Sequence, residues 1–413
     1  MNKKIYPREK YLSEIRPFYD SDIVKVITGI RRCGKSSLLI SIMDELKRLG
    51  HESHIIYLPL DKRGYKNIKT PEELEKAIEQ EIKDEDKYYL FIDEVQNVKG
   101  FESIVLEYEE EGYSIFLTGS NSYLLSDEIS TKLTGRYVNF ETYPLDFKEY
   151  LELKKFFNIS VNDDVYEEFN NYLIEGGFPK TLEFGDLKSK QLYTKEIIRE
   201  IFEKDVKTRN KITNTVLFER VQSYIINNYS APFSLKNLFD SLKVSGVNTK
   251  LTTVRHYIET LQKAKIVYEC NRFDLKSKKS LMREQKYYLA DLSVYFSTNT
   301  DNSYNYGPSL ENMIYLYLLG KGFEVSIGKI GNLECDFIIR KTNNEYAYIQ
   351  VAYTLNAGDK EINKKITERE YRPFRKIHDG YPRYIISLDR YRIQQEGVHH
   401  INAIDLFLGN VSI

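Results

Sequence analysis

The chain has 413 residues, enough for two to four domains, and its 41% hydrophobic and 29% charged residues are ordinary for a globular protein. A net charge of −1 excludes a chain-wide attraction to nucleic acid, so any such affinity must come from a local patch. The N-terminus lacks the apolar core of a signal peptide, and no run approaches the ~20 apolar residues that span a membrane. The three cysteines form no metal-binding spacing, and these features together predict a cytoplasmic protein with no membrane partner.

Residues 29–36 carry the most specific pattern of the chain, G-x-x-x-x-G-K-S, between a β-branched run (23–28) and a helical run (37–46). This order of strand, glycine loop and helix is typical of a loop that binds the phosphates of ATP. The glycines let backbone N–H groups approach an anion, and the helix adds the positive end of its dipole. Lys35 is expected to reach the β- and γ-phosphates, and the Ser36 hydroxyl to hold Mg²⁺. The predicted nucleotide-binding residues are Gly29, Ile30, Arg31, Arg32, Cys33, Gly34, Lys35, Ser36 and Ser37.

A second motif is the apolar run 88–92, which ends in Asp93 and Glu94. Strands buried on both faces of a parallel sheet read as continuous apolar runs, and ligands sit at their carboxyl ends. Asp93 is therefore expected to help hold Mg²⁺ beside the nucleotide. Glu94 is expected to act as the general base that polarises the attacking water.

Two further segments offer groups that could complete the reaction. A third strand, 113–118, is followed by Ser120 and Asn121, and either of them could sense the γ-phosphate and orient the water. Downstream, Arg136 stands next to a glycine, and an arginine from a neighbouring subunit often completes a phosphoryl-transfer site. A surface arginine with no such role is the alternative, because no spacing fixes its position.

These segments together carry a resemblance to a known family. The chain resembles the AAA+ ATPases of a prokaryotic family of unknown cellular role in the segments ITGIRRCGKSSLL, FIDEVQNV, LTGSN, LTGRYV, EGGFP and KYYLADLSV. The resemblance covers nearly the whole chain and implies ATP hydrolysis. It also implies a C-terminal domain of unknown function that is related to restriction-endonuclease-like folds.

The alternation of strands and helices predicts how the N-terminal half is organised. Residues 1–150 are expected to form the P-loop domain, with a parallel doubly wound sheet. Residues 151–213 read as a helical lid over the nucleotide, broken at Gly176 and Gly177 because paired glycines permit unusual backbone angles.

Residues 214–300 are predicted to form a winged helix-turn-helix, with three short helices followed by two strands. Between residues 236 and 286 twelve bases and five acids give a local net charge of +7. On this reading Lys250, Arg255 and Lys263 would contact the phosphates of double-stranded DNA. A winged module used only for packing against protein is the alternative.

Residues 301–413 are predicted to form an α/β domain resembling the PD-(D/E)xK nuclease core, in which acidic groups hold Mg²⁺ and activate water while a lysine stabilises the developing phosphate charge. Glu311 and Asp336 occupy the first two positions. The third reads Gln350 followed two residues later by Ala352, so an acid and the lysine are missing, although Lys341 could swing in. The pattern therefore favours a degenerate module without nuclease activity.

The leading hypothesis is an ATPase switch that couples its nucleotide state to the winged module and the nuclease-like module, and acts on DNA. One alternative is an ATP-regulated DNA nuclease of a defence or mobile-element system. Another is a scaffold that binds ATP and proteins but turns over slowly. A homo-oligomer and a partner protein both stay open.

Overall fold

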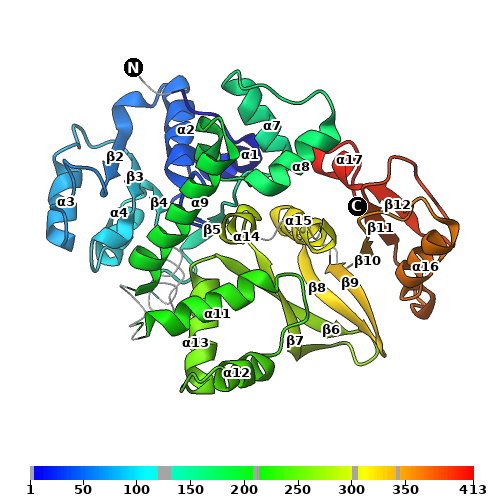
Figure 1. Ribbon diagram of the computed structural model, residues 1–413. Coiled ribbons are helices and arrows are strands. Elements are labelled where there is room, and N and C mark those ends of the chain that lie inside the picture. Colours follow the sequence, from blue (N-terminus) through cyan, green and yellow to red (C-terminus); the bar gives the residue numbers. More distant parts are fainter. Residues whose placement is uncertain (1–3, 120–131, 208–211, 213, 300–305, 341–344) are drawn as a thin grey trace.

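The computed structural model describes residues 4–119, 132–207, 212, 214–299, 306–340 and 345–413. Figure 1 shows an N-terminal α/β unit in blue and cyan, a group of helices in green, and a second sheet that runs into the C-terminal elements in yellow to red. Within the described residues, no helix is long and apolar enough to cross a membrane.

The N-terminal unit contains a five-stranded parallel sheet of described residues in the order β2-β3-β4-β1-β5. The predicted parallel sheet is confirmed, and the sequence analysis missed its edge strand β5. The strands are β1 (Val24–Thr28), β2 (Ile55–Pro59), β3 (Tyr89–Asp93), β4 (Ser114–Thr118) and β5 (Tyr137–Glu141). The accompanying helices are α1 (Glu9–Ile15), η1 (Arg16–Phe18), α2 (Lys35–Arg48), η2 (Glu52–His54), α3 (Pro71–Glu79), η3 (Val95–Asn97) and α4 (Glu102–Glu110).

Successive side chains of each central strand enter two different cores, because strand side chains alternate between the faces of a sheet. Leu90 and Ile92 of β3 pack in the core that includes α3 and α4, whereas Phe91 packs in the core that includes α1 and α2. Burial on both faces places the functional groups of this sheet at the carboxyl ends of its strands.

The lid follows as α7 (Phe147–Phe156), α8 (Val165–Glu175), η4 (Pro179–Glu183), α9 (Leu187–Ile201) and the π-helix η5 (Phe202–Lys207). The predicted break after α8 is confirmed, and its cause is a close backbone approach. A Cβ atom on Gly177 would lie 2.2 Å from the Leu145 carbonyl oxygen, and Gly176 has a φ of 78°. The lid thus joins the linker after β5 through glycines that have no side chain to clash.

Three helices and a hairpin come next: α11 (Thr215–Asn227), α12 (Leu235–Val244), α13 (Leu251–Lys263), β6 (Val267–Asp274) and β7 (Lys279–Leu289). Ser234 caps α12, since its hydroxyl accepts a hydrogen bond from the Asn237 N–H at 3.3 Å. Val254, Ile258 and Leu261 are buried, so α13 packs inward through one apolar face.

The hairpin is continuous with the C-terminal sheet. Among the described residues seven strands run in the order β12-β11-β10-β9-β8-β6-β7, and β6 pairs in parallel with β8. Hydrogen bonds of one sheet therefore cross the expected division at residue 300. The remaining elements are α14 (Ser293–Thr298), α15 (Tyr306–Gly320), β8 (Glu324–Ile330), β9 (Leu333–Arg340), β10 (Tyr346–Val351), α16 (Lys360–Tyr371), η6 (Phe374–Lys376), β11 (Arg383–Ser387), β12 (His399–Asn402) and α17 (Ala403–Leu408).

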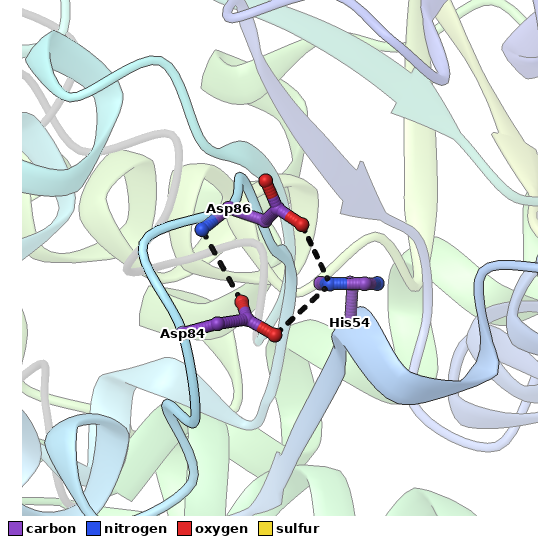
Figure 2. A group of neighbouring side chains, drawn as sticks. All are labelled: His54, Asp84 and Asp86. Atoms are coloured by element: carbon purple, nitrogen blue, oxygen red, sulfur yellow. Dashed lines mark hydrogen bonds and ion pairs between the residues drawn. The ribbon is translucent and has the colours of Figure 1, made fainter.

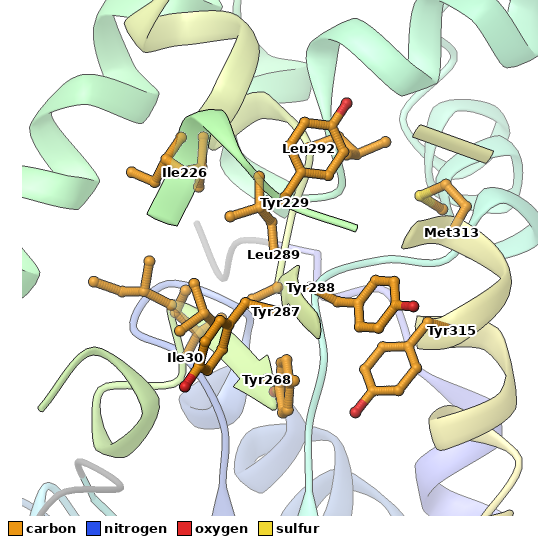
Figure 3. Packing of buried hydrophobic residues seen from close by; sticks show 14 of the residues in the cluster. Ile30, Ile226, Tyr229, Tyr268, Tyr287, Tyr288, Leu289, Leu292, Met313 and Tyr315 are labelled. Carbon is orange, nitrogen blue, oxygen red and sulfur yellow. The ribbon is translucent and has the colours of Figure 1, made fainter. Parts of the chain in front are cut away.

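One large hydrophobic core joins the nucleotide loop to the rest of the chain. It contains Ile30 and Cys33 of the loop, together with residues of the lid, the three helices, the hairpin and α15. Figure 3 shows Ile30 in the same packing as Tyr268 and Tyr287 of the hairpin, and the rings of Tyr288 and Tyr315 stack with centroids 4.1 Å apart. The apolar side of the loop is therefore fixed by packing.

Lys25 is a buried lysine in β1, an interior strand of the parallel sheet. Its Nζ donates hydrogen bonds to the Ser21 carbonyl oxygen (2.6 Å) and to Ser114 Oγ (2.9 Å), and it lies 4.7 Å from the centroid of the Phe116 ring. Burial lowers the pKa of Lys25 to about 7, although nearby aspartates oppose this shift. The unfolded chain holds the same proton up to a pKa of about 10.4.

We expect the free energy of unfolding to rise from pH 7 to pH 9, because over this range the folded state loses a proton that the unfolded state keeps. The Lys25 contribution should approach about 1.4 kcal/mol per pH unit at most. Urea unfolding of wild type and Lys25→Met at several pH values measures the Lys25 contribution. The variant should lose this part of the increase in the free energy of unfolding with pH. The exposed Lys47→Met serves as control, and equal slopes in all three proteins would contradict the prediction.

Candidate functional site

The loop at residues 29–34 joins the carboxyl end of β1 to the N-terminus of α2. Gly29 has a φ of 141°, and a Cβ atom there would lie 2.0 Å from the Thr142 carbonyl oxygen. Arg32 (φ 69°) and Gly34 (φ 108°) also have left-handed backbone, which bends the chain sharply before the helix begins. Glycine at position 29 is thus required both by its backbone angle and by the close approach of Thr142.

Lys35 and Ser36 begin α2 and face the site. The buried Lys35 ammonium donates to the carbonyl oxygens of Gly29 (2.8 Å) and Ile30 (3.1 Å), so it lies across the loop. Ser36 Oγ donates to Asp93 Oδ1 at 3.1 Å. The structure therefore brings together the two residues predicted to hold Mg²⁺. Their hydroxyl and carboxylate oxygens are the hard ligands that Mg²⁺ prefers, so the donor set fits the ion.

Asp93 is buried and held from several sides. Its carboxylate accepts hydrogen bonds from the Tyr57 hydroxyl (3.3 Å) and from Thr118 Oγ1 as well as from Ser36. Burial raises the pKa of Asp93, and the hydroxyl donors on β4 and α2 oppose that rise. A cation next to the Asp93 carboxylate would therefore offset the free-energy cost of keeping this charge buried.

Glu94 adopts the left-handed conformation, with a φ of 59°. Its N–H donates to Thr118 Oγ1 at 3.1 Å, and its carboxylate accepts from the Gln96 side-chain amide. Thr118 thus positions both predicted acidic residues. Sequence reasoning missed it, although it is the polar last residue of an otherwise apolar strand.

The remaining predicted reaction groups are placed less directly. Ser120 and Asn121 lie outside the described residues. Arg136 stands at the start of β5, where its carbonyl oxygen accepts from the Val24 N–H, and its guanidinium lies 2.9 Å from the carboxylates of Glu109 and Glu110. Arg136 therefore lies where β1 and β5 begin, at the opposite end of these strands from the phosphate loop. A role for Arg136 across a subunit boundary stays a prediction.

The two loop arginines bind the lid. Arg31 forms a two-pronged pair with Asp205 of η5, with Nε to Oδ2 at 2.9 Å and Nη2 to Oδ1 at 3.0 Å. Arg32 pairs with Glu200 of α9 at 2.9 Å, and Lys204 shares that carboxylate. The loop is thus tied to the lid by charge as well as by packing.

Arg8 supports the loop from behind, and no sequence pattern pointed to it. Its buried guanidinium pairs with both carboxylate oxygens of Glu149 (2.8 and 2.6 Å). It also donates to the carbonyl oxygens of Cys33 (3.0 Å), Tyr143 (2.9 Å) and Pro144 (3.4 Å). Glu149 in turn forms a capping box with Asp146 at the start of α7, so one cation orders the loop, the linker and the lid.

The predicted DNA-binding residues Lys250, Arg255 and Lys263 are all exposed on or next to α13. The exposed Glu259 stands between Arg255 and Lys263 at four-residue spacing, so an acid interrupts this basic face. Other bases of the +7 segment turn inward and pair with acids. Lys265 forms an ion pair with Glu141, and both Arg272 and Lys286 form ion pairs with Glu334. The exposed positive charge is smaller than the sequence count.

In the C-terminal unit the three predicted nuclease-like positions come together. Asp336 of β9 donates its N–H to Gln350 Oε1 at 2.9 Å, and its carboxylate accepts from the Val351 N–H at 2.8 Å. Gln350 also donates to Glu370 Oε2 at 2.9 Å, so both ends of its amide are used. Glu311 of α15 belongs to the same cluster, and its charge helps to raise the pKa of Asp336 after burial.

A lysine that sequence reasoning missed lies in this cluster. Lys286 comes from β7, and its Nζ lies 2.9 Å from Glu311 Oε1 and 2.8 Å from Glu334 Oε1. The sequence analysis named only Lys341 as a lysine that could swing in, and Lys341 lies outside the described residues. Burial alone would lower the pKa of Lys286, but the surrounding carboxylates outweigh it and raise that pKa. Because an internal ammonium already binds these carboxylates, the residues as arranged do not fit a bound Mg²⁺.

A separate group of metal-binding side chain types lies at the edge of the N-terminal sheet (Figure 2). His54 Nε2 is 3.5 Å from Asp84 Oδ2 and 3.4 Å from Asp86 Oδ2. The aspartate side chains are 49% and 77% exposed, so water competes for them. The group lies away from the nucleotide loop, and we assign it no role beyond a surface ion pair when His54 is protonated.

Comparisons with known proteins agree with this geometry in the N-terminal half. A family model described as an AAA domain matches residues 21–151, and a domain of unknown function (DUF8612) matches residues 166–303. The second match spans α8 to α14, so it includes both the lid and the three helices with their hairpin.

Whole-chain relatives also exist. An uncharacterized protein of Haemophilus influenzae is 31% identical over 99% of this chain and 100% of its own length. The uncharacterized protein MJ1544 of Methanocaldococcus jannaschii is 31% identical over 84% of this chain and 78% of its own length. The solved structure of the Aeropyrum pernix ORC1 protein in complex with DNA covers 72% of this chain and 94% of that chain, with 13% identity and a TM-score of 0.30, too weak a likeness to support an inference.

The Lys286 cluster gives a stability prediction. Replacing Lys286 with Met leaves Glu311 and Glu334 without their shared cation and should lower the free energy of unfolding by about 3 kcal/mol. Urea unfolding measures this loss, and Lys279→Met, at an exposed position of the same strand, should change it by less than about 0.5 kcal/mol. Adding Glu311→Gln to Lys286→Met should recover part of the loss. Equal stability of the two lysine variants would show that the cluster does not depend on its cation.

Proposed function

We propose that this chain, which belongs to the same family as the uncharacterized Haemophilus influenzae and Methanocaldococcus jannaschii proteins, is an ATP-hydrolysing switch. The observation that carries the proposal is the hydrogen bond from Ser36 to Asp93 at the carboxyl edge of a parallel sheet, next to a Lys35 that lies across the glycine loop of an AAA domain. ATP is the substrate that this arrangement favours, because a lysine, a helix N-terminus and a hydroxyl–carboxylate pair are the groups that hold a nucleoside triphosphate.

The reaction follows from where these groups stand. Lys35 exchanges its bonds to two loop carbonyls for the negatively charged phosphates. Bound Mg²⁺, held by Ser36 and Asp93, would supply neutralisation of the phosphate charge. Glu94 accepts a proton from the water that attacks the γ-phosphorus, and ADP leaves with its terminal oxygen. Thr118 holds the Asp93 carboxylate and the Glu94 backbone in position during this step through its two hydrogen bonds.

The nucleotide state would reach the rest of the chain through the lid. Arg31 and Arg32 connect the loop to η5 and α9, and α9 leads toward the three helices. The order of three helices and a hairpin is that of a winged helix-turn-helix, and exposed bases on α13 favour contact with DNA phosphates. The interrupting Glu259 favours the second candidate, a module that binds protein. We do not propose nuclease activity, because the neutral Gln350 stands where the nuclease core has an acid and its amide is bonded to Asp336 and Glu370.

The first test separates binding from chemistry. Glu94→Gln should bind ATP with unchanged affinity and hydrolyse it at least about 100-fold more slowly, because only the proton acceptor is lost. Lys35→Ala should lose the rise in melting temperature that ATP gives to wild type. Phosphate release and melting curves measure these effects, with the exposed Glu107→Gln as control. Wild-type turnover in Glu94→Gln would move the base elsewhere, and an unchanged ATP effect in Lys35→Ala would refute the site.

The second test concerns DNA. Replacing Lys250, Arg255 and Lys263 with Ala should weaken binding of duplex DNA broadly across sequences. It should also flatten the dependence of log affinity on log salt by roughly one unit for each DNA phosphate that no longer meets a cation. A variant with the same charge change at the exposed Lys47, Lys148 and Lys188 is the control. If wild type shows no binding at low salt, the protein-binding candidate replaces the DNA-binding one.

A further inference from the structure

Arg31 occupies the third position of the phosphate loop, yet its side chain leaves the loop for the lid. Both prongs of the guanidinium bind Asp205, and Nη1 lies 3.8 Å from Glu200. The side chains of Arg31 and Asp205 are only 16% and 7% exposed. Such a forked, water-shielded pair is stronger and more directional than a surface ion pair.

The predicted general base Glu94 also acts on the Arg31 guanidinium through its charge. Burial opposes its charge, but the carboxylates of Asp205 and Glu94 outweigh burial, with Glu200 adding to them, and raise the pKa of Arg31. Arg31 is thus fully charged and stands within electrostatic reach of both the expected general base and the lid. Among the described loop residues, Arg32 is more exposed and has its partner on α9 instead.

Asp205 belongs to an unusual element. It lies in the π-helix η5, which continues α9, and π-helical turns are rare and frequently found at functional sites. The α9 helix packs against α14, and its Gln191 donates to the Phe296 carbonyl oxygen at 3.2 Å. A change at Asp205 would therefore act on an element already joined to the chain beyond the hairpin.

We propose that Arg31 reads the γ-phosphate, leaving the Asp205 carboxylate when ATP is bound and staying on it when ADP is bound. The inference rests on the proposed ATP site and adds a residue that distinguishes the two nucleotides. An arginine fork binds a carboxylate and a phosphate with the same two-pronged geometry, so one partner replaces the other without leaving the charge unpaired. The exchange releases η5 from the loop, and the lid then differs between the two nucleotide states.

The first experiment measures affinity for ATPγS and for ADP by displacement of a fluorescent nucleotide. Arg31→Gln should weaken ATPγS at least tenfold and leave ADP within about twofold, because only the terminal phosphate loses a partner. Arg199→Gln, on the exposed side of α9, is the matched control and should change neither. Equal losses for both nucleotides would overturn the proposal and leave Arg31 as a general binding residue. Failure of wild type to bind either nucleotide would instead overturn the ATP site itself.

The second experiment asks whether the partner exchange occurs. Melting temperatures of wild type, Arg31→Gln, Asp205→Asn and the double variant form a cycle that isolates the pair. With ADP the two single losses should be non-additive, since either change breaks the same bond. With ATPγS they should become additive, because the bond is already open. Glu196→Gln replaces Asp205→Asn in a control cycle. Non-additivity of equal size with both nucleotides would show a fixed tether and overturn the exchange.

Discussion

The buried guanidinium of Arg8 is the interaction on which the nucleotide loop depends. A charge out of water is tolerated only when it is paired and its N–H groups are bonded, and here Glu149 and three backbone carbonyls meet that demand. One of those carbonyls belongs to Cys33 in the loop itself. Any movement of the back of the loop would leave a buried cation short of partners, so the loop is held rigid from that side.

The opposite side of the loop has a different character. Ile30 and Cys33 are anchored in the large core, whereas Arg31 and Arg32 reach across to acidic groups of the lid. Packed hydrocarbon resists displacement, whereas a guanidinium can bind a carboxylate or a phosphate with the same two-pronged geometry. The chain therefore combines a fixed cradle with a replaceable electrostatic contact. Such a division suits a protein in which a bound phosphate changes the contacts of the lid while the backbone of the phosphate loop stays in place.

Much of the N-terminal unit was predictable because its signals are local. The apolar runs 88–92 and 113–118 are typical of buried strands, and the glycine loop carries its own spacing, so the placement of Lys35 and Asp93 followed. β5 was missed because its sequence, YVNFE, is short and partly polar. Arg8 and Lys286 were missed because the acids that they bind lie far away in the sequence. The residues next to an arginine or a lysine do not indicate that it will pair with a buried carboxylate. The local net charge of +7 overstated the exposed positive charge for the same reason, because it counted bases that pair with acids from distant parts of the sequence.

The continuous sheet has a consequence for how such a chain can change over generations. Arg272, Phe273 and Asp274 of β6 pair with residues of β8, which lies beyond residue 300. A gene shortened at that point would encode a protein with an unpaired strand edge, and such edges recruit other chains into aggregates. Modules that are shuffled between genes are normally closed units with few contacts across their boundaries. The hairpin and the C-terminal elements instead share one sheet, so a recombination that separates them would expose this edge even where the phosphate loop is untouched.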